Sequence, residues 1–328
     1  MPNEVWGKAM RNFLVALVVS VSSGAALADE APELRYLELD GRLQIDFAKG
    51  GATQKTPFAL ASVGKAMTSV AVLRLVEDGL LSLDDPAHRY LSGDIVRGFD
   101  GLQGITVRHL LTMTSGLPDY FDDAYFEAAV DDPGTVQQPD VAVSFAYDLD
   151  AEFTPGDAFS YSNTNYVLLG LILEEVTQLS YGDVLKAEVF EPAGMTYAFV
   201  FGTQTLPDDF PLLQAGFPHY RAYYEGQGFG DGGVIASAQD LSRFYRATFY
   251  DRTLLSEPML REMLSDPTGE GYGMGIGFEE GWVGHAGSDF HTLTNVVMDT
   301  ESGDLAIHLS ADMDADIAWA ETVWADFD

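Results

Sequence analysis

Apolar and polar residues alternate near the amino-terminal end of the chain, over residues 34–39 and 42–47. Alternation with a period of two is typical of half-buried strands. Asp40-Gly41 separates the two segments, and Asp-Gly in that position favours a tight hairpin. The pattern therefore predicts an antiparallel pair of strands at the start of the chain.

The long middle of the chain changes to helical patterns. The run from Val70 to Val76 is apolar nearly all round, as in a buried helix. Thr106 is a suitable N-cap for a helix over residues 107–113, and residues 165–178 form another apolar helical segment. The segment 237–240, Ser-Ala-Gln-Asp, has the pattern of a capping box and predicts a helix start.

Strand patterns return towards the carboxyl-terminal end, over residues 280–284, 292–299 and 305–309. Turn-forming residues at 300–304 join the last two of these segments. Residues 314–324 are expected to form a closing helix.

Strands at both ends with helices between them favour an α+β fold. We expect an antiparallel sheet with flanking helices, built from both chain ends, residues 29–61 and 270–328. A mostly α-helical domain, residues 62–269, would be inserted between them, with the active site where the two domains meet. A length of 328 residues suits one large domain or two modest ones.

The first 28 residues predict export. Lys8 and Arg11 precede an apolar run over residues 13–21, and small residues follow up to Ala26-Leu27-Ala28. This order is that of a secretory signal peptide, and the run is too short for a membrane span. We expect cleavage after Ala28, a periplasmic or secreted protein and no stable membrane anchor.

Composition narrows the classes of partner and chemistry. A net charge of −34 repels nucleic acid, so we expect no nucleic-acid partner. The absence of cysteine excludes disulfides, thiol catalysis and thiolate metal sites. The six histidines show no His-Glu-x-x-His spacing, so we do not expect a metalloenzyme, and we expect no cofactor. No Gly-x-Ser-x-Gly elbow occurs, so an ordinary α/β-hydrolase is not expected either. The oligomeric state stays open.

The strongest chemical signal is Ser62-Val-Gly-Lys65 at the start of the apolar helix. Residues three apart share one helix face, so the Lys65 amine can reach the Ser62 hydroxyl as a base beside a nucleophile. A buried ammonium is costly unless it is paired or neutralised. The alternative is that Ser62 is only an N-cap and Lys65 extends to solvent.

Two further segments carry candidate site residues. Tyr161-Ser162-Asn163 lies just before the helix at 165–178; Tyr161 could relay a proton, and Asn163 could orient Lys65 or bind a substrate carbonyl. The alternative is a polar helix cap. The segment 284–288, Gly-His-Ala-Gly-Ser, ends a predicted strand, and its glycines would let a substrate lie against the backbone. A strand histidine such as His285 can also be merely structural.

Together these three segments resemble the active-site motifs of the penicillin-recognising serine hydrolases. The similarity is greatest to the branch of class C β-lactamases, D-alanyl-D-alanine carboxypeptidases and β-lactamase-like esterases. The relatives are known by Ser-x-x-Lys and a Lys-Thr-Gly third motif. Further similar segments lie at residues 75–80, 83–86, 110–118, 191–195 and 232–241.

The resemblance implies a mechanism and a set of roles. Ser62 would form an acyl-enzyme, and Lys65 and Tyr161 would move its proton, although which of the two is the base is disputed among relatives. The backbone N–H groups of Ser62 and Ser288 would form the oxyanion hole. The substrate-binding candidates are Asn163, His285, Gly287 and Ser288.

Departures from the family pattern refine the expected function. Ala286 replaces the hydroxyl residue that helps relatives hold a substrate carboxylate, which weakens both the β-lactam and the D-alanyl-D-alanine interpretations, and His285 replaces a lysine, which argues against an efficient class C β-lactamase. Asp289 and His291 are expected to reshape the pocket; the alternative is that they are ordinary strand residues. We therefore expect an exported serine hydrolase acting on an ester or amide, as an esterase or a D-amino-acid amidase or carboxypeptidase, with a small-molecule or peptide-like acyl substrate. The alternatives are a true β-lactamase, or a non-catalytic descendant that binds peptidoglycan or a protein.

Overall fold

The computed structural model describes residues 30–132, 138–206, 220–290 and 292–312, with isolated positions at 208, 210, 211, 215, 315 and 319. The predicted signal peptide and His291 lie outside the described residues. So does the predicted helix over residues 314–324, apart from two isolated positions.

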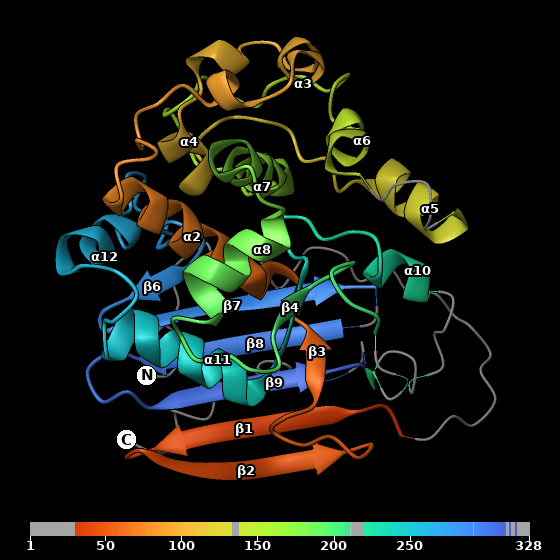
Figure 1. Cartoon of the computed structure of the whole chain (residues 1–328), viewed down its shortest axis with the longest axis vertical. Coiled ribbons are helices and arrows are strands. Elements are labelled where there is room, and N and C mark those ends of the chain that lie inside the picture. Colours follow the sequence, from red (N-terminus) through yellow and green to blue (C-terminus); the bar gives the residue numbers. More distant parts are fainter. Residues whose placement is uncertain are drawn as a thin grey trace.

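A six-stranded antiparallel sheet joins the two ends of the chain (Figure 1). Its strand order is β2-β1-β9-β8-β7-β6, so β1 from the amino-terminal part pairs with β9 from the carboxyl-terminal part. This confirms the expected α+β fold with a sheet built from both chain ends. The strands are β1 (Glu33–Leu39), β2 (Arg42–Lys49), β6 (Gly277–Glu279), β7 (Trp282–Asp289), β8 (Thr292–Asp299) and β9 (Leu305–Ser310).

The predicted hairpin forms as the sequence indicates. Leu39 pairs with Arg42, so Asp40 and Gly41 are the two central residues of the turn. Both have positive φ angles, 51° and 69°, as the tight turns that match strand twist require. Asp and Gly tolerate this backbone region better than other residues, which is why the dipeptide predicts the turn.

The predicted strand over residues 280–284 was wrong in its boundaries. Glu280 and Gly281 form the turn between β6 and β7, with φ angles of 30° and 92°. Strand β7 then continues to Asp289, so the third motif lies inside a strand rather than at its end. Its glycines and alanine have low strand propensity, and pairing with β8 along the whole segment overrides that local preference.

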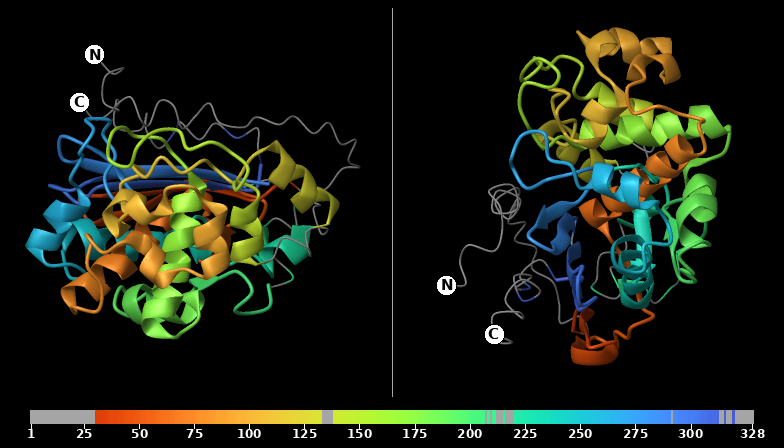
Figure 2. Two further views of the ribbon diagram at one scale, coloured as in Figure 1. Left: turned by 90° about the horizontal axis from the view of Figure 1, so that it is seen from above. Right: turned by 90° about the vertical axis from the view of Figure 1, so that its left-hand side faces the viewer.

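Helices cover one face of the sheet and extend above it (Figures 1 and 2). The α-helices are α2 (Lys65–Glu77), α3 (Gly93–Gly98), α4 (Val107–Leu111), α5 (Asp123–Asp131), α6 (Pro139–Ser144), α7 (Asn163–Thr177), α8 (Tyr181–Leu185), α10 (Arg221–Tyr224), α11 (Ala238–Tyr245) and α12 (Glu257–Met263). Shorter helical segments are η1 (Ala61–Gly64), η2 (Ala87–Tyr90), η3 (Leu102–Gly104), η4 (Lys186–Phe190) and η6 (Arg246–Tyr250). A second sheet has the order β3-β5-β4, with β3 (Pro57–Ala59), β5 (Val234–Ser237) and β4 (Phe199–Val200).

Helix ends follow the capping chemistry of the sequence with two differences. Thr106 accepts a hydrogen bond from the His109 amide and starts α4, which ends two residues before the expected position because Met113 turns to φ 56°. Ser237 likewise accepts from the Asp240 amide at 3.2 Å. The Asp240 carboxylate, however, accepts from the backbone amides at 196 and 197, so it ties α11 to a distant loop.

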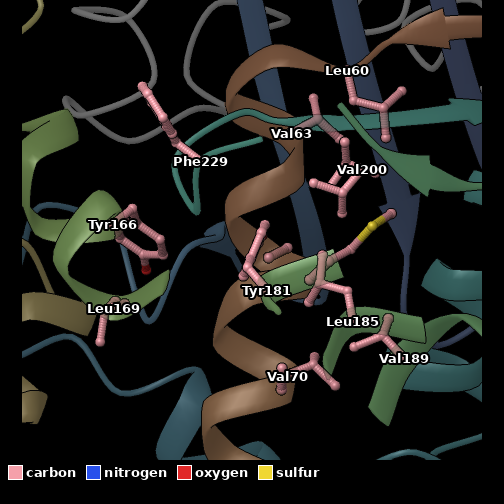
Figure 3. Close-up of a cluster of buried hydrophobic side chains, with 14 of the residues drawn as sticks. Leu60, Val63, Val70, Tyr166, Leu169, Tyr181, Leu185, Val189, Val200 and Phe229 are labelled. Atoms are coloured by element: carbon pink, nitrogen blue, oxygen red, sulfur yellow. The ribbon is translucent and has the colours of Figure 1, made fainter. Parts of the chain in front are cut away.

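Helix α2 lies at the centre of the core. Its residues from Lys65 to Leu73 are all buried, and it packs against α7 and α8. Figure 3 shows Val63 and Val70 among side chains of α7, α8 and β4. Burial of each large apolar side chain contributes roughly 1.5–3 kcal/mol, so this layer holds the start of α2 firmly in place.

One helix of the expected helical domain instead covers the sheet. Helix α11 lies against β9, and Ser242 Oγ donates to Glu38 Oε1 of β1 at 2.8 Å. Arg246 of η6 forms an ion pair with the same Glu38 at 3.6 Å. The division into residues 62–269 and the chain ends stays a prediction. Among the helices in the described ranges, none is long and apolar enough to cross a membrane.

Candidate active site

Ser62 lies in the single turn of η1, between β3 and α2. The preceding residue, Ala61, has a φ of 46°, a region that non-glycine residues rarely occupy. Hydrogen bonds to the backbone of Leu60 hold this turn: its N–H donates to Val234 O at 2.9 Å, and Thr294 Oγ1 donates to its carbonyl at 2.8 Å. The surrounding structure therefore fixes a strained backbone immediately before Ser62.

The Lys65 amine contacts three oxygens and no solvent. Nζ lies 3.0 Å from Ser62 Oγ, 2.7 Å from Asn163 Oδ1 and 2.6 Å from the backbone oxygen of Asp231. The side chain is 0% exposed, so the alternative in which Lys65 extends to solvent does not describe this residue. Burial lowers the pKa of Lys65 to about 8, although nearby carboxylates oppose the shift.

This geometry suits a neutral lysine that accepts a proton. In the neutral amine, two N–H groups can continue to donate to Asn163 Oδ1 and Asp231 O. The nitrogen lone pair then faces the Ser62 hydroxyl, at the 3.0 Å separation expected of a nucleophile and its base.

The Tyr161 side chain also lies close to the Lys65 amine. The Lys65 Nζ is 5.0 Å from the centre of its ring. Burial raises the pKa of the Tyr161 hydroxyl well above its ordinary value, although a hydrogen bond with the Ser62 side chain works in the opposite direction. Tyr161 is therefore protonated at neutral pH and suited to relaying a proton, whereas Lys65 is the better candidate for the base.

Asn163 is held by a carboxylate that sequence analysis missed. The Asp119 carboxylate accepts from the Asn163 backbone amide at 3.0 Å and from its Nδ2 at 2.9 Å. This pair of bonds caps the start of α7 and turns Asn163 Oδ1 towards Lys65. Burial raises the pKa of Asp119 to about 6.

Gly287 allows the third motif to lie directly against the nucleophile's turn. A Cβ at this position would be 2.7 Å from Leu60 O and 2.9 Å from Ser62 N, closer than real side chains approach. Strand β7 and η1 are therefore in backbone contact, with Ser288 next in sequence and exposed at the cleft. The proposed oxyanion hole of Ser62 and Ser288 amides is compatible with this arrangement.

His285 is buried next to Tyr161 and is not among the residues that line the cleft. The residue is 3% exposed, its Nε2 lies 3.1 Å from the Tyr272 hydroxyl, and its ring centre is 6.4 Å from that of Tyr161. Burial and the charge of Lys65 lower the pKa of His285 to about 3. His285 is therefore neutral and supplies no positive charge for a substrate carboxylate.

The cleft in front of Ser62 encloses about 430 Å³, part of it open to solvent. Its walls are aromatic, amide and acidic. The lining comprises Ala61, Ser62, Tyr120, Phe121, Asn163, Phe201, Tyr223, Gln227, Phe229, Asp231, Gly232, Gly233, Ser288 and Asp289. Asn163 and Ser288 were expected here, and Asp289 borders the pocket as its place after the third motif suggested.

Most of the residues that line the cleft were not predicted from the sequence. Tyr120, Tyr223 and Asp231 come from separate segments, and Tyr120 donates to Asp231 Oδ2 at 2.7 Å. The nearest signal is that Asp119 and Asp231 each adjoin a segment similar to the family, residues 110–118 and 232–241. Within the described part of the chain, no group of three acidic or histidine side chains is arranged to hold a metal ion.

Comparison with known proteins places this geometry in a family. The family model described as Beta-lactamase matches residues 39–314. A penicillin-binding protein of Bacillus subtilis strain 168 is 31% identical over 285 residues, which are 80% of this chain and 59% of that protein. The chain thus spans little more than half the length of this curated relative.

Two solved structures share the fold. The penicillin-binding protein of Bacillus halodurans has a TM-score of 0.74 at 24% identity, with 90% of this chain and 94% of that chain covered. A D-stereospecific amidohydrolase from Streptomyces has a TM-score of 0.72 at 24% identity, covering 89% and 94%. Because the family model matches most of its length, the chain belongs to the β-lactamase family of serine hydrolases.

Proposed function

We propose that this chain hydrolyses an ester or amide through an acyl-enzyme on Ser62, as an esterase or a D-amino-acid amidase. The observation that carries the proposal is the fully buried Lys65 amine, 3.0 Å from Ser62 Oγ. The cleft in front of Ser62 gives a small-molecule or peptide-like acyl substrate access to that oxygen.

The reaction would proceed in two halves. Ser62 Oγ attacks the acyl carbon while neutral Lys65 takes its proton, and the Ser62 and Ser288 amides stabilise the developing oxyanion. The proton then passes through Lys65 and Tyr161 to the departing alcohol or amine, leaving Ser62 acylated. A water molecule then attacks the acyl carbon and gives a proton to the same pair, which returns it to Ser62 Oγ as the bond to the acyl group breaks, so the free acid leaves and Ser62 is regenerated.

The third motif favours this function over β-lactam hydrolysis. Ala286 has no hydroxyl group and His285 is neutral, so neither supplies the carboxylate contact expected for a penicillin. The fold similarity to a D-stereospecific amidohydrolase supports an amide substrate. A β-lactam carboxylate would also meet the acidic side chains of the cleft.

Covalent trapping tests the proposal. Diethyl p-nitrophenyl phosphate is neutral and leaves a stable phosphoryl group on an activated serine. We expect one adduct by intact-mass spectrometry, located to the peptide that contains Ser62, with one equivalent of p-nitrophenolate released. Ser62→Ala should give neither. Modification of another residue, or none at all, would exclude the proposed nucleophile.

The pH dependence of neutral ester hydrolysis should report Lys65. Because burial lowers the pKa of Lys65 to about 8, kcat/KM should rise with pH and level off above that midpoint. About a tenth of the molecules hold the free base at pH 7, against about one in three thousand for a lysine of ordinary pKa. Initial rates with p-nitrophenyl acetate measure this profile. A rate independent of pH through this range would contradict Lys65 as the base.

A further inference from the structure

We propose that Asp289, Tyr223 and Gln227 form a subsite that binds a protonated amine on the acyl part of the substrate. The inference rests on the proposed function and names its substrate class: amides or esters of amine-bearing acids. The substrate's ammonium group would lie against the Asp289 carboxylate, and an acceptor oxygen of the same molecule would meet Gln227.

Charge in the cleft is the first observation. Asp231 and Asp289 both line it, whereas the lining in the described ranges contains no lysine, arginine or histidine. Lys65 does not balance this charge at the surface, because it is fully buried beneath Ser62 and its amine already contacts three oxygens. A cationic group therefore suits this cleft, and an anionic group does not.

The position of Asp289 is the second observation. Side chains alternate along a strand, so Asp289 emerges from the same face of β7 as Gly287, which abuts the Ser62 amide. Its Oδ1 accepts from the Phe290 amide at 2.8 Å and from the Tyr223 hydroxyl at 3.4 Å. The carboxylate is therefore oriented by the protein, one residue beyond Ser288 of the oxyanion hole.

The Gln227 side chain is an independent observation that supports a ligand site. Its side chain lines the cleft, is 2% exposed, and accepts a hydrogen bond from Tyr125 through Oε1. No acceptor in the described part of the chain contacts Gln227 Nε2. A buried donor without a partner is costly, and a ligand oxygen would satisfy it.

The remaining surroundings favour a cation. Tyr223 and Phe229 give the cleft aromatic faces, which attract ammonium groups. Burial and the nearby Asp231 raise the pKa of Asp289 to about 7. A bound ammonium beside Asp289 would stabilise the ionised carboxylate and lower its pKa, so these surroundings favour binding of a cation.

Competition against p-nitrophenyl acetate hydrolysis tests the subsite without requiring turnover of the probe. The first probe is phenylalaninamide, which is a cation. The other two are its neutral N-acetyl derivative and its anionic N-succinyl derivative, and each probe is tested as the D and the L form. We expect the more tightly binding enantiomer of phenylalaninamide to inhibit about 10- to 100-fold more strongly than its N-acetyl derivative. This is the range expected for a hydrogen bond to a charged group. The N-succinyl derivative should inhibit most weakly.

Variants separate recognition from folding. Asp289→Asn keeps the shape of the side chain and should abolish the preference for the cation, measured as the ratio of the inhibition constants of the cationic and N-acetyl probes within that variant. Asp289→Glu should restore part of the preference. Asp251→Asn removes an acid from an exposed position outside the cleft and should behave as wild type.

Each other result has a distinct meaning. Equal inhibition by the cationic and neutral amides, or none by either, would overturn the subsite while ester hydrolysis still supported the proposed function. A preference that survives in Asp289→Asn would overturn the role of that carboxylate. Failure of both ester hydrolysis and phosphate trapping would instead remove the proposed function itself.

Discussion

Replacing Ser62 with alanine is expected to lower kcat for p-nitrophenyl acetate by about 10⁴-fold or more, the scale seen when a serine nucleophile is removed. The alanine leaves Lys65 without an attacking group to activate, although Asn163 and Asp231 still accept its hydrogen bonds. Steady-state kinetics and a thermal melt measure the two effects. The melting temperature should stay within about 3 °C of wild type, because only one polar contact is lost.

Ser69→Ala is the matched control for this change. Ser69 lies in α2, the helix that directly follows the turn with Ser62, is buried, and shares a hydrogen bond with Tyr166 at 3.0 Å. It should keep most of the activity despite the loss of that bond. If Ser62→Ala retained a tenth of wild-type kcat, the acyl-enzyme mechanism would have to be abandoned.

Replacing Lys65 with methionine should lower kcat/KM by about 10²- to 10⁴-fold, the usual contribution of a positioned general base. Methionine fills similar space but cannot accept the Ser62 proton. The oxygens of Asn163 and Asp231 would lose a donor, at a cost of about 1–3 kcal/mol, while the penalty of burying an amine disappears. Kinetics with p-nitrophenyl acetate and a thermal melt together distinguish lost chemistry from lost folding.

A second substitution separates basicity from charge. Lys65→Arg keeps a cation but cannot deprotonate near neutral pH, so it should be nearly as inactive as Lys65→Met. Lys186→Met provides the exposed control and should be unaffected, since Lys186 is exposed and its ion pair with Glu191, at 3.9 Å, lies at the surface. High activity in the arginine variant would show that Lys65 acts through its charge alone.

The arrangement around Ser62 explains why one lysine has unusual properties. Burial disfavours its ammonium form, and the carboxylates of Asp231, Asp119 and Asp289 favour it. Burial has the larger effect, so the balance leaves Lys65 able to deprotonate near neutral pH. Two of these carboxylates, Asp231 and Asp289, also line the cleft, so the groups that oppose deprotonation of Lys65 are the ones expected to favour the cationic substrate that we propose.

Local chemistry was sufficient for several elements. The Asp40-Gly41 turn, the Thr106 and Ser237 caps and the strands after residue 291 follow from residues close together in sequence. The spacing of Ser62 and Lys65 on one helical segment also specified their contact. Such features depend on backbone preference and on periods of two or 3.6 residues, which a single segment carries by itself.

The sequence by itself thus determined the α+β architecture, the hairpin and the Ser62–Lys65 pair. Tertiary structure alone decided the extent of β7, because pairing with β8 outweighs the weak strand preference of its small residues. It also decided that Asp119 orients Asn163, and that Gln227 and Asp289 face one cleft. Those side chains are far apart along the chain, and they meet only because burial of the apolar helices and closure of the sheet bring their segments together.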